Sequence, residues 1–287
     1  MKKRIVGILL TAVMAVGMLA GCGGKKTDDA AQKGAASAET ETSAPAETAG
    51  SEDGRTTFIV GFDAEYPPYG YMDDNGEYTG FDLELAEKVC EMEGWELKKQ
   101  PIDWNFKDME LDAGKIDCIW NGFTINGRED EYEWSDPYVD NSQVIVVGKD
   151  SGITKLADLE GKVVGVQAAS AALTVLTDEE QQKALGDSFK ELQQFADYNV
   201  AFTELQAGTL DALAIDIGVA KYQLDSRGDG FVMLDEELNK EQYGIGFKKG
   251  NTSLRDVVNA DLHKLAADGT VATLAEKYGI ADMICIE

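Results

Sequence analysis

The chain has 287 residues, and its 53 Asp and Glu residues outnumber its 26 Lys and Arg residues, leaving a formal net charge of −27. This excess of negative charge argues against a nucleic-acid partner and against adsorption on anionic lipid. The only histidine, His263, lies in a helical pattern at a surface position, so neither a Ser-His-Asp nor a Cys-His mechanism has a base to use.

The N-terminal segment is typical of an export signal. Basic residues at positions 2–4 precede an apolar run over residues 5–20, which is too short for a comfortable membrane span. The following Leu-Ala-Gly-Cys motif, which ends at Cys22, resembles the lipobox of bacterial lipoproteins, in which the cysteine is lipid-modified and becomes the mature N-terminus. We predict a lipoprotein signal peptide over residues 1–21; the alternative is an uncleaved anchor or a buried N-terminal helix. In either case the protein works outside the cytoplasm.

Residues 22–54 form a tether in this prediction. They are mostly Lys, Thr, Asp, Ala, Ser, Glu and Gly, with no aromatic residue, and cannot bury enough apolar surface to offset the entropy of ordering. Removal of the signal takes three positive and no negative residues, which changes the net charge from −27 to −30.

The body of the protein begins at about residue 55 and is long enough for one large or two small cores. Its three cysteines, Cys90, Cys118 and Cys285, form no CxxC motif and no Cys/His cluster. We therefore expect neither a disulfide framework nor a metal site, and interpret all three as buried small apolar residues. We expect no cofactor.

The first predicted elements of the body are a strand and a helix. An apolar strand over residues 59–62 leads to a turn at Asp63. Thr79, with Asp82 three residues on, is placed as the N-cap of a helix whose apolar stripe includes Leu85, and Gly94 ends it.

The stretch over residues 115–130 predicts a buried strand that runs into a helix start. Asn126 and Glu129 have the spacing of an N-cap and its capping-box partner. The turn between strand and helix would carry Gly122 and Thr124, and Arg128 would lie in the first helical turn. Free N–H groups, a hydroxyl and a guanidinium would then converge as a carboxylate requires. The alternative is an ordinary strand-turn-helix with a surface arginine.

The body also contains a near-repeat. Residues 105–117 and 199–211 share Glu, Leu, Gly and Asp at positions offset by 94, and each copy follows an apolar strand that ends in a turn. Chance resemblance is the alternative, because the shared pattern is short. The repeat predicts two similar βαβ-like lobes rather than a solenoid, whose periods are shorter.

Two strands are predicted to cross between the lobes. The first is the β-branched run over residues 144–147 and the second lies near residues 243–247. An amphipathic helix over residues 254–265 follows, Gly269 stops it, and Thr270 caps the next helix, so both can return to the first lobe. Lobe 1 is thus predicted over residues 55–145 and 246–287, and lobe 2 over residues 146–245.

A set of motifs in this order resembles the extracellular solute-binding proteins of polar amino acid ABC transporters, bacterial solute-binding protein family 3. The resemblance covers nearly everything after residue 55. It rests on Val60-Gly61-Phe62-Asp63-Ala64-Glu65-Tyr66-Pro67-Pro68-Tyr69, Gly80-Phe81-Asp82, Asn121-Gly122-Phe123-Thr124, Ser135-Asp136-Pro137-Tyr138, Leu159-Glu160-Gly161-Lys162 and Asp211-Ala212.

The resemblance implies a type II periplasmic-binding-protein-like α/β fold, with two lobes that close on one free amino acid. The ligand would lie between Tyr66 and Trp104, with its α-ammonium on Asp216 and its side chain near Asp63. Gly122, Thr124 and Arg128 would take the α-carboxylate, and backbone N–H groups at Ser170 and Ala171 would add to it from the second lobe. The implied ligand-binding set is Asp63, Tyr66, Trp104, Asn121, Gly122, Thr124, Arg128, Gln167, Ser170, Ala171 and Asp216.

Two departures from the family pattern affect this set. The chain has one residue fewer between Thr124 and Arg128 than members commonly have, which would shift the arginine. Its second-lobe turn reads Ala168-Ala169-Ser170-Ala171 where members often have Gly-Ser-Thr, so backbone donors would replace a hydroxyl.

Independently of the family resemblance, the residue types support a binding site for a zwitterion, because burying either of the ligand's charges without a partner is costly. Asp216 ends an apolar strand, where a carboxylate is unexpected unless it binds a ligand. The alternative is that Asp216 caps the next helix. For Tyr66 and Trp104 the alternative is ordinary core packing.

The leading interpretation is the binding component of an importer, not an enzyme, with a free amino acid and ABC permease subunits as partners and a lipid on Cys22 as its link to the membrane. We expect a monomer. One alternative is an enzyme resembling cyclohexadienyl dehydratases, with Asp63 as general acid. Another is a sensor ectodomain, which is disfavoured because no kinase or transmembrane helix follows Glu287.

Overall fold

The computed structural model describes residues 54–287. The predicted signal peptide over residues 1–21, the lipidation site Cys22 and nearly all of the predicted tether lie outside the described residues. Within the described part, no helix is both long enough and apolar enough to cross a bilayer.

The first lobe comprises the elements up to β7 together with the C-terminal helices. Its elements are β1 (Thr57–Phe62), β2 (Glu65–Tyr66), β3 (Gly70–Met72), β4 (Tyr78–Thr79), α1 (Phe81–Glu93), β5 (Glu96–Pro101), the 3₁₀ helix η1 (Trp104–Phe106), α2 (Lys107–Asp112), β6 (Cys118–Thr124), β7 (Glu133–Trp134), α7 (Thr252–Ala267), α8 (Thr270–Lys277) and the 3₁₀ helix η3 (Ala281–Met283).

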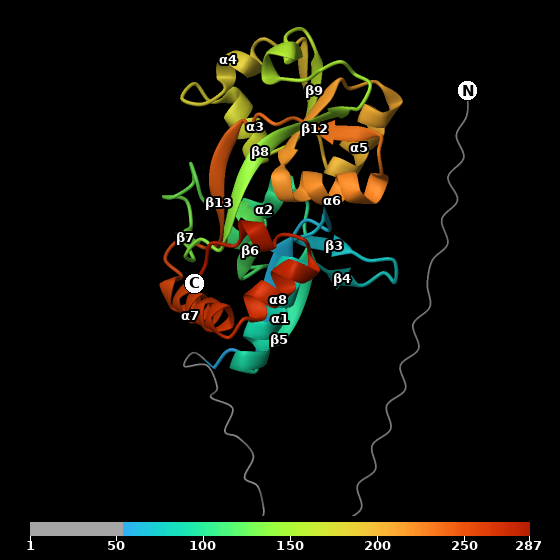
Figure 1. Cartoon of the computed structure of the whole chain (residues 1–287). Helices are drawn as coiled ribbons and strands as arrows, with labels where there is room; N and C mark the ends of the chain where they lie inside the picture. Colours follow the sequence, from blue (N-terminus) through green and yellow to red (C-terminus); the bar gives the residue numbers. More distant parts are fainter. Residues whose placement is uncertain (1–53) are drawn as a thin grey trace, which may run out of the picture. The chain divides into compact units, whose positions relative to one another are not determined.

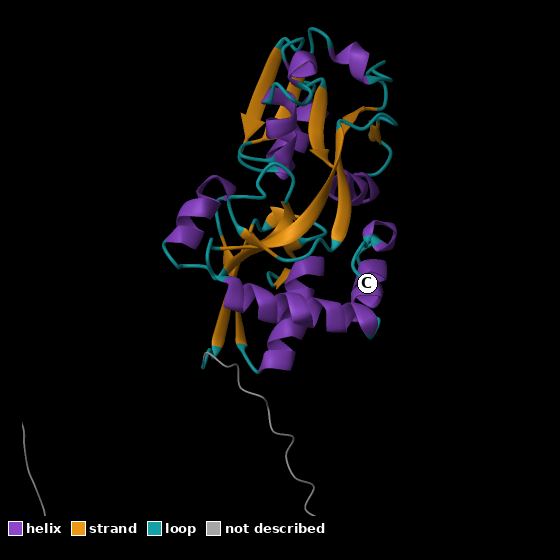
Figure 2. Cartoon of the chain, turned by 90° about the vertical axis from the view of Figure 1, so that its left-hand side faces the viewer, coloured by secondary structure: helices purple, strands orange, loops and turns teal. Residues whose placement is uncertain are grey.

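The second lobe comprises the 3₁₀ helix η2 (Leu156–Leu159), β9 (Val163–Gln167), α3 (Ala171–Thr177), α4 (Lys183–Gly186), β10 (Glu191–Phe195), α5 (Tyr198–Ala207), β11 (Ala212–Asp216), α6 (Ile217–Arg227) and β12 (Phe231–Met233). Two long strands, β8 (Val139–Gly148) and β13 (Asn239–Phe247), run between the lobes (Figure 1). Helices cover each end of this strand scaffold (Figure 2). The predicted lobe boundaries fall inside β8 and β13 and remain a prediction.

The main sheet shows an internal symmetry. Its main path has the order β10-β9-β11-β8-β13-β6-β1-β5, to which each lobe contributes three strands, and each crossing strand lies next to the innermost of them. Off this path, β12 pairs with β8 and β7 pairs with β13. β1 is parallel to β5 and β6, β9 is parallel to β10 and β11, and β8 and β13 are antiparallel to each other. Parallel strands place their carboxyl ends at a shared edge, where ligands of open α/β sheets bind.

The near-repeat corresponds to equivalent structure in the two lobes. The carboxylate of Asp117 accepts the backbone N–H of Ile59 at 2.7 Å, and the carboxylate of Asp211 accepts that of Val163 at 2.8 Å. In both lobes the aspartate's own N–H is donated back to the carbonyl of the same strand residue. These reciprocal bonds align the first strand with the strand that follows the repeat.

The start of α1 differs from the prediction. Gly80 occupies the N-cap position and no side chain caps the helix, because the hydroxyl of Thr79 bonds to Glu84 and to the hydroxyl of Tyr278 instead. Asp82 is fully buried and turned toward β6. Gly94 ends the helix in the left-handed conformation, as predicted. Thr270 begins α8 as its first helical residue and does not cap it.

The predicted helix start at Asn126 is wrong. Gly122 and Thr124 lie within β6, and the chain then turns through residues 125–132 to reach β7 without forming a helix. The side chain of Asn126 accepts the backbone N–H of Gln242 rather than capping a helix. Pairing with β13 thus satisfies a group that the local sequence offered to a helix.

The predicted crossing strands and the return of the C-terminal helices are confirmed: α7 and α8 pack against α1 in the first lobe (Figure 1). Cys90 and Cys118 are buried free thiols, as expected. Cys285 is only half-buried, so its interpretation as a buried core residue is wrong. His263 lies at the surface and contacts Asp136 and the carbonyl of Glu287.

Candidate functional site

All eleven residues of the predicted ligand set line a single cavity, together with Phe123. They come from segments far apart in the sequence, which the carboxyl ends of β1, β6, β9 and β11 bring together. Room for water within the cavity is only about 20 Å³, which is about one molecule. The lobes are therefore closed on each other here, and a role for these residues in ligand binding remains a proposal.

Direct hydrogen bonds join the lobes at the cavity. Nε2 of Gln167 donates to Oδ2 of Asp63 at 2.7 Å, and the side chain of Asn199 donates to Glu65. Asp63 and Gln167 hold equivalent positions, each just past the aligned glycine of its own first strand. The two lobes thus meet through matching points of their internal repeat.

Asp63 is buried and held on three sides. Its Oδ1 accepts the N–H of Glu65 at 2.9 Å, and its own N–H donates to Oδ1 of Asn121 at 2.9 Å. Burial, only partly offset by these hydrogen bonds, raises its pKa to about 6. At neutral pH this side chain is mostly an ionised acceptor.

Arg128 lies in the turn after β6, where two contacts with Phe123 and Thr124 orient it. Its guanidinium lies 5.2 Å from the ring centre of Phe123, and Nη1 donates to the carbonyl of Thr124 at 3.1 Å. Nε1 of Trp134 donates to the carbonyl of Arg128 at 2.9 Å, which fixes the turn. Among the described residues Arg128 makes no ion pair within 4.0 Å, so its fork retains donors for an anion.

Gly122 does not offer the free N–H that the sequence suggested. Its N–H donates to Oδ2 of Asp82 at 2.6 Å, and the other oxygen of Asp82 accepts the hydroxyl of Tyr138 at 2.8 Å. Complete burial raises the pKa of Asp82 to about 7. The N–H of Gly122 therefore serves the packing of α1 on β6, and only its carbonyl oxygen can serve a ligand.

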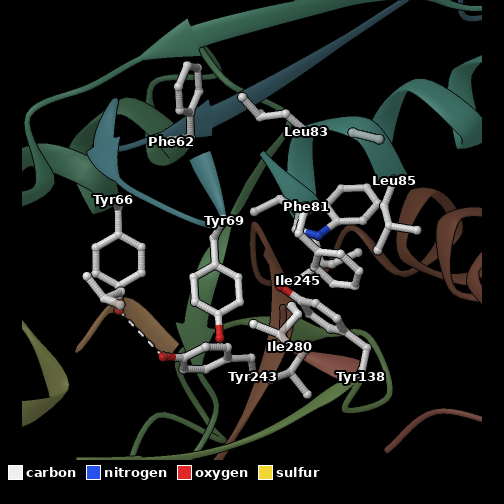
Figure 3. Packing of buried hydrophobic residues seen from close by; sticks show 14 of the residues in the cluster. Phe62, Tyr66, Tyr69, Phe81, Leu83, Leu85, Tyr138, Tyr243, Ile245 and Ile280 are labelled. Atoms are coloured by element: carbon white, nitrogen blue, oxygen red, sulfur yellow. Dashed lines mark hydrogen bonds between the residues drawn. The ribbon is translucent and has the colours of Figure 1, made fainter. Parts of the chain in front are cut away.

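Gly122 is nevertheless needed as a glycine. Its φ is +56°, and a Cβ there would lie 3.0 Å from ring atoms of both Tyr66 and Tyr243. These rings, with Tyr69, form the aromatic wall visible in Figure 3, where a dashed line joins the hydroxyls of Tyr66 and Tyr243. A side chain at Gly122 would push this wall away.

The hydroxyl of Thr124 is directed differently from the prediction. It donates to Oε1 of Glu241 at 2.9 Å, so its hydrogen is not available to a ligand carboxylate. Glu241 is a buried residue of β13 that the sequence analysis missed. What Thr124 presents to the cavity is an acceptor oxygen.

Asp216 is held by donors and does not cap α6 with its side chain. Its Oδ1 accepts from Tyr243 at 2.6 Å, from Gln143 at 2.6 Å and from Asn141 at 2.9 Å. Burial first, and then the charge of Glu241, raise its pKa to about 6. The cap interpretation is thus wrong, and the strand-end carboxylate is buried inside a polar network.

The aromatic residues belong to the core as well as to the cavity. Trp104 lies edge-on to Phe123 with ring centres 5.5 Å apart, and Tyr66 faces Tyr198 of the second lobe at 6.1 Å. Both are buried. Each of these two side chains therefore both packs in the core and lines the cavity.

On the second lobe, Ser170 caps α3 and thereby places Ala171 at the first helical position. The hydroxyl of Ser170 accepts the N–H of Leu173 at 3.2 Å and donates to the carbonyl of Gln167 at 2.8 Å. Ala169 before it has a φ of +56°, a rare conformation for a residue with a side chain. The turn thus presents the start of α3 to the cavity without a free hydroxyl.

Three residues that were not predicted as site residues surround Asp216 on the two crossing strands: Asn141, Gln143 and Glu241. Asn141 lies directly opposite Glu241 in the β8–β13 pairing, and all three side chains are buried. Polar residues alternating along otherwise buried strands were the available signal. Among the described residues, no group of three or more His, Cys, Asp or Glu side chains has the arrangement of a metal site.

Comparison with known proteins gives a consistent picture. The chain is 29% identical over 232 residues to the L-cystine-binding protein TcyJ of Escherichia coli, covering 80% of this chain and 85% of that protein. It is 31% identical over 236 residues to the arginine-binding extracellular protein ArtP of Bacillus subtilis, covering 80% and 88%.

Among solved structures, it resembles an ABC uptake transporter substrate-binding protein from Streptococcus pneumoniae with bound histidine. The TM-score is 0.73 at 34% identity, covering 77% of this chain and 92% of that one. The sequence model that describes the family of bacterial extracellular solute-binding proteins, family 3, matches residues 58–281 of this chain. The chain therefore belongs to the bacterial extracellular solute-binding proteins of family 3.

Proposed function

We propose that this protein is the substrate-binding component of an ABC uptake transporter, and that it encloses one free amino acid between its two lobes. The observation that carries this proposal is that Arg128 of the first lobe and Asp216 of the second line the same nearly dry cavity. A zwitterion brings a carboxylate and an ammonium that need such partners, since either charge buried alone is costly. The relatives quoted above are named for binding amino acids, which supports the same class of ligand.

In this proposal Arg128 takes the α-carboxylate, with the N–H of Ala171 as a further donor. Asp216 takes the α-ammonium, joined by the carbonyl of Gly122, whose N–H is already committed to Asp82. Asp63 lies toward the ligand's side chain and favours amide, amine or guanidinium groups over aliphatic ones.

Binding requires the lobes to open, because the present cavity has room for about one water only. β8 and β13 are the two connections about which they would move. Tyr66, Gln167 and Tyr198 would separate from their partners across the cleft and meet again over the ligand.

At the cell, the lobes would present the ligand to the permease subunits of the transporter. Lipidation of Cys22 and the tether over residues 22–54 would hold the body near the membrane as a monomer. Mass spectrometry of the N-terminal peptide from membranes tests this part: an unmodified Cys22 would contradict it.

The test of ligand class is a thermal-shift screen of the twenty amino acids plus cystine. A ligand at a hundred times its dissociation constant adds about 2.7 kcal/mol to stability, an easily measured shift. The amide and the N-acetyl derivative of the best ligand should bind poorly, since each lacks one charge. No response to any amino acid would refute the proposal, and tight binding of leucine or valine alone would refute the role of Asp63.

The structure gives the dehydratase alternative little support. A general acid must hold a proton to donate, but both oxygens of Asp63 accept hydrogen bonds, from Glu65 and from Gln167, and these favour its ionised form. Turnover of prephenate or arogenate by the purified protein would restore that alternative.

A further inference from the structure

The polar network around Asp216 has more acceptors than donors. The amide nitrogens of Asn141 and Gln143 each donate to both Asp216 and Glu241, at distances of 2.6–2.9 Å. The hydroxyls of Tyr243 and Thr124 are donated to Asp216 and Glu241 as well. Each of these four side chains thus donates to one or both of the two carboxylates.

Two buried oxygens of this network are left without a donor. Oδ1 of Asn141 and Oε1 of Gln143 have no hydrogen-bond partner, although Asn141 is 4% exposed and Gln143 is fully buried. Unsatisfied acceptors in a buried site are uncommon and costly. The acceptors of this network that line the cavity are the hydroxyl oxygen of Thr124 and the carboxylate of Asp216, and an ammonium has three N–H donors to offer them.

Glu241 stands behind this end of the cavity rather than in it. It does not line the cavity, but it holds the hydroxyl of Thr124, which does, and it shares both amide donors with Asp216. Its Oε2 is anchored separately by Nδ2 of Asn239 at 3.1 Å. Its place on β13, opposite Asn141 on β8, puts it at the junction of the two crossing strands.

We propose that Glu241 is the positioning residue of the ligand's ammonium subsite: by holding the donors of Thr124, Asn141 and Gln143, it leaves Thr124 and Asp216 to face the cavity as acceptors, which suits a cationic N–H group. The inference rests on the proposed function and deepens it, because it assigns Thr124 to the ammonium rather than to the carboxylate. The recognition unit is then Asp216 and Glu241 together, joined by the two amides.

Glu241 also bears on the protonation of Asp216. The charged and titratable groups facing Asp216 are Glu241 and Tyr243 from β13, Tyr66 and Tyr69 from the first lobe, and Tyr198 from α5. Burial raises the pKa of Asp216 most, and the charge of Glu241 is the next cause. Loss of that charge should therefore lower the pKa of Asp216 and move the acid limit of ammonium binding to lower pH.

The experiment compares Glu241→Gln with the parent in calorimetry, using an amino acid and its α-hydroxy analogue, in which a hydroxyl replaces the ammonium. The probe pairs are L-arginine with argininic acid and L-histidine with imidazolelactic acid. In the parent, the amino acid should bind at least tenfold more tightly than its analogue. In Glu241→Gln this preference should fall at least fivefold, while affinity for the analogue changes less than twofold.

The pH dependence of amino-acid affinity in the two proteins provides a second readout, which a merely structural role would not move. The midpoint of the acid loss, near pH 6 in the parent, should shift to lower pH in Glu241→Gln. Glu237→Gln is the matched control, because Glu237 carries the same charge close by and its contacts are with Ser142 and Lys240, outside this network. Glu241→Asp keeps the charge and should retain most of the preference for the amino acid over its analogue. It also provides a second test of the proposal if the Gln variant does not fold.

Equal weakening of both members of a pair, or an unchanged midpoint, would overturn the role of Glu241 while leaving the proposed function intact. A parent that binds neither arginine nor histidine, nor any amino acid in the thermal-shift screen, would instead refute the proposed function itself.

Discussion

The two lobes share a scaffold but differ where their strands end. In each, a first strand lies beside a strand that follows the repeat, and an aspartate, Asp117 or Asp211, bonds back to the first strand. By the strand registers, Gly122 of β6 is the counterpart of Asp216 of β11. One lobe thus has a glycine followed by an arginine-bearing turn where the other has a buried carboxylate.

The packing behind these ends is also shared. A Cβ on Gly61 would lie 2.4 Å from Cδ1 of Ile116, and a Cβ on Gly165 would lie 2.6 Å from Cδ1 of Leu210, the equivalent contact in the other lobe. The glycine positions inside the lobes therefore make the same packing contact in both lobes, whereas the positions that face the cavity carry different residues. This divergence turns two similar surfaces into opposite electrostatic partners, which suits a dipolar ligand.

The largest expected effect comes from removing the charge that each lobe supplies to the cavity. Arg128→Ala and Asp216→Asn should each weaken amino-acid binding by about 3–5 kcal/mol, on the order of a hundred- to several-thousand-fold in affinity, because one ligand charge is left unpaired. Arg128→Lys should remain clearly impaired, since an ammonium lacks the planar fork. Calorimetry on variants shown to be folded by circular dichroism decides this, and near-parent affinity in either neutral variant would mean that the clamp lies elsewhere.

The shared scaffold can be tested by the same change in both lobes. Asp117→Ala and Asp211→Ala should each lower the unfolding free energy by about 1–3 kcal/mol, because a strand N–H loses its acceptor. The loss at Asp117 should be the larger, since that carboxylate also pairs with Arg55 at 2.8 Å. Urea unfolding measures both; Asn variants, which keep an acceptor oxygen, serve as controls, and a large effect in one lobe only would argue against equivalence.

A change of pH should separate binding from folding. Ammonium recognition needs ionised Asp216, so lowering the pH from 7.5 to 5 should weaken amino-acid affinity about tenfold for a pKa of about 6. The stability contribution of this group runs the other way: its folded-state pKa is raised, so it stabilises the fold at low pH and that stability is lost as pH rises between about 4 and 6.

The matched pair for this prediction is Asp216→Asn and Asp63→Asn, whose parent carboxyls both have a pKa of about 6. Asp216→Asn should remove the acid loss of affinity, whereas Asp63→Asn should keep it and alter side-chain preference. Calorimetry from pH 5 to 7.5 measures affinity, and urea unfolding of the unliganded proteins measures stability. An unaltered acid loss in Asp216→Asn would count against its contact with the ammonium.

The smallest expected effect sharpens a second asymmetry: the aromatic residues that line the cavity, Tyr66, Trp104 and Phe123, all come from the first lobe. Trp104→Phe should cost about 0.5–1.5 kcal/mol in affinity and abolish much of the fluorescence change on binding. Trp134→Phe is the control, because Trp134 packs on Phe123 at 4.9 Å but does not line the cavity. If Trp104→Phe shows the spectral change of the parent, Trp104 is not the reporter of closure.

Sequence alone determined the scaffold and the membership of the cavity. Strand runs, the near-repeat and the C-terminal amphipathic helix depend on local apolar periodicity and on short-range spacing, so they could be identified without coordinates. The eleven cavity residues could be named because the family resemblance carried them as a set, and the structure places all of them in one cavity.

Only the tertiary structure decided how those residues are used. A linear sequence assigns no partner to a donor or an acceptor. The sequence therefore could not show that Asp82 accepts the N–H of Gly122 or that Glu241 accepts the hydroxyl of Thr124. The same reason explains the absent helix at Asn126, whose side chain has a capping pattern but meets the backbone of β13, more than a hundred residues on, instead. Long-range pairing outweighed a local preference there, because Gln242 of β13 bonds to this turn twice: its N–H donates to Asn126 and its carbonyl accepts the N–H of Ile125.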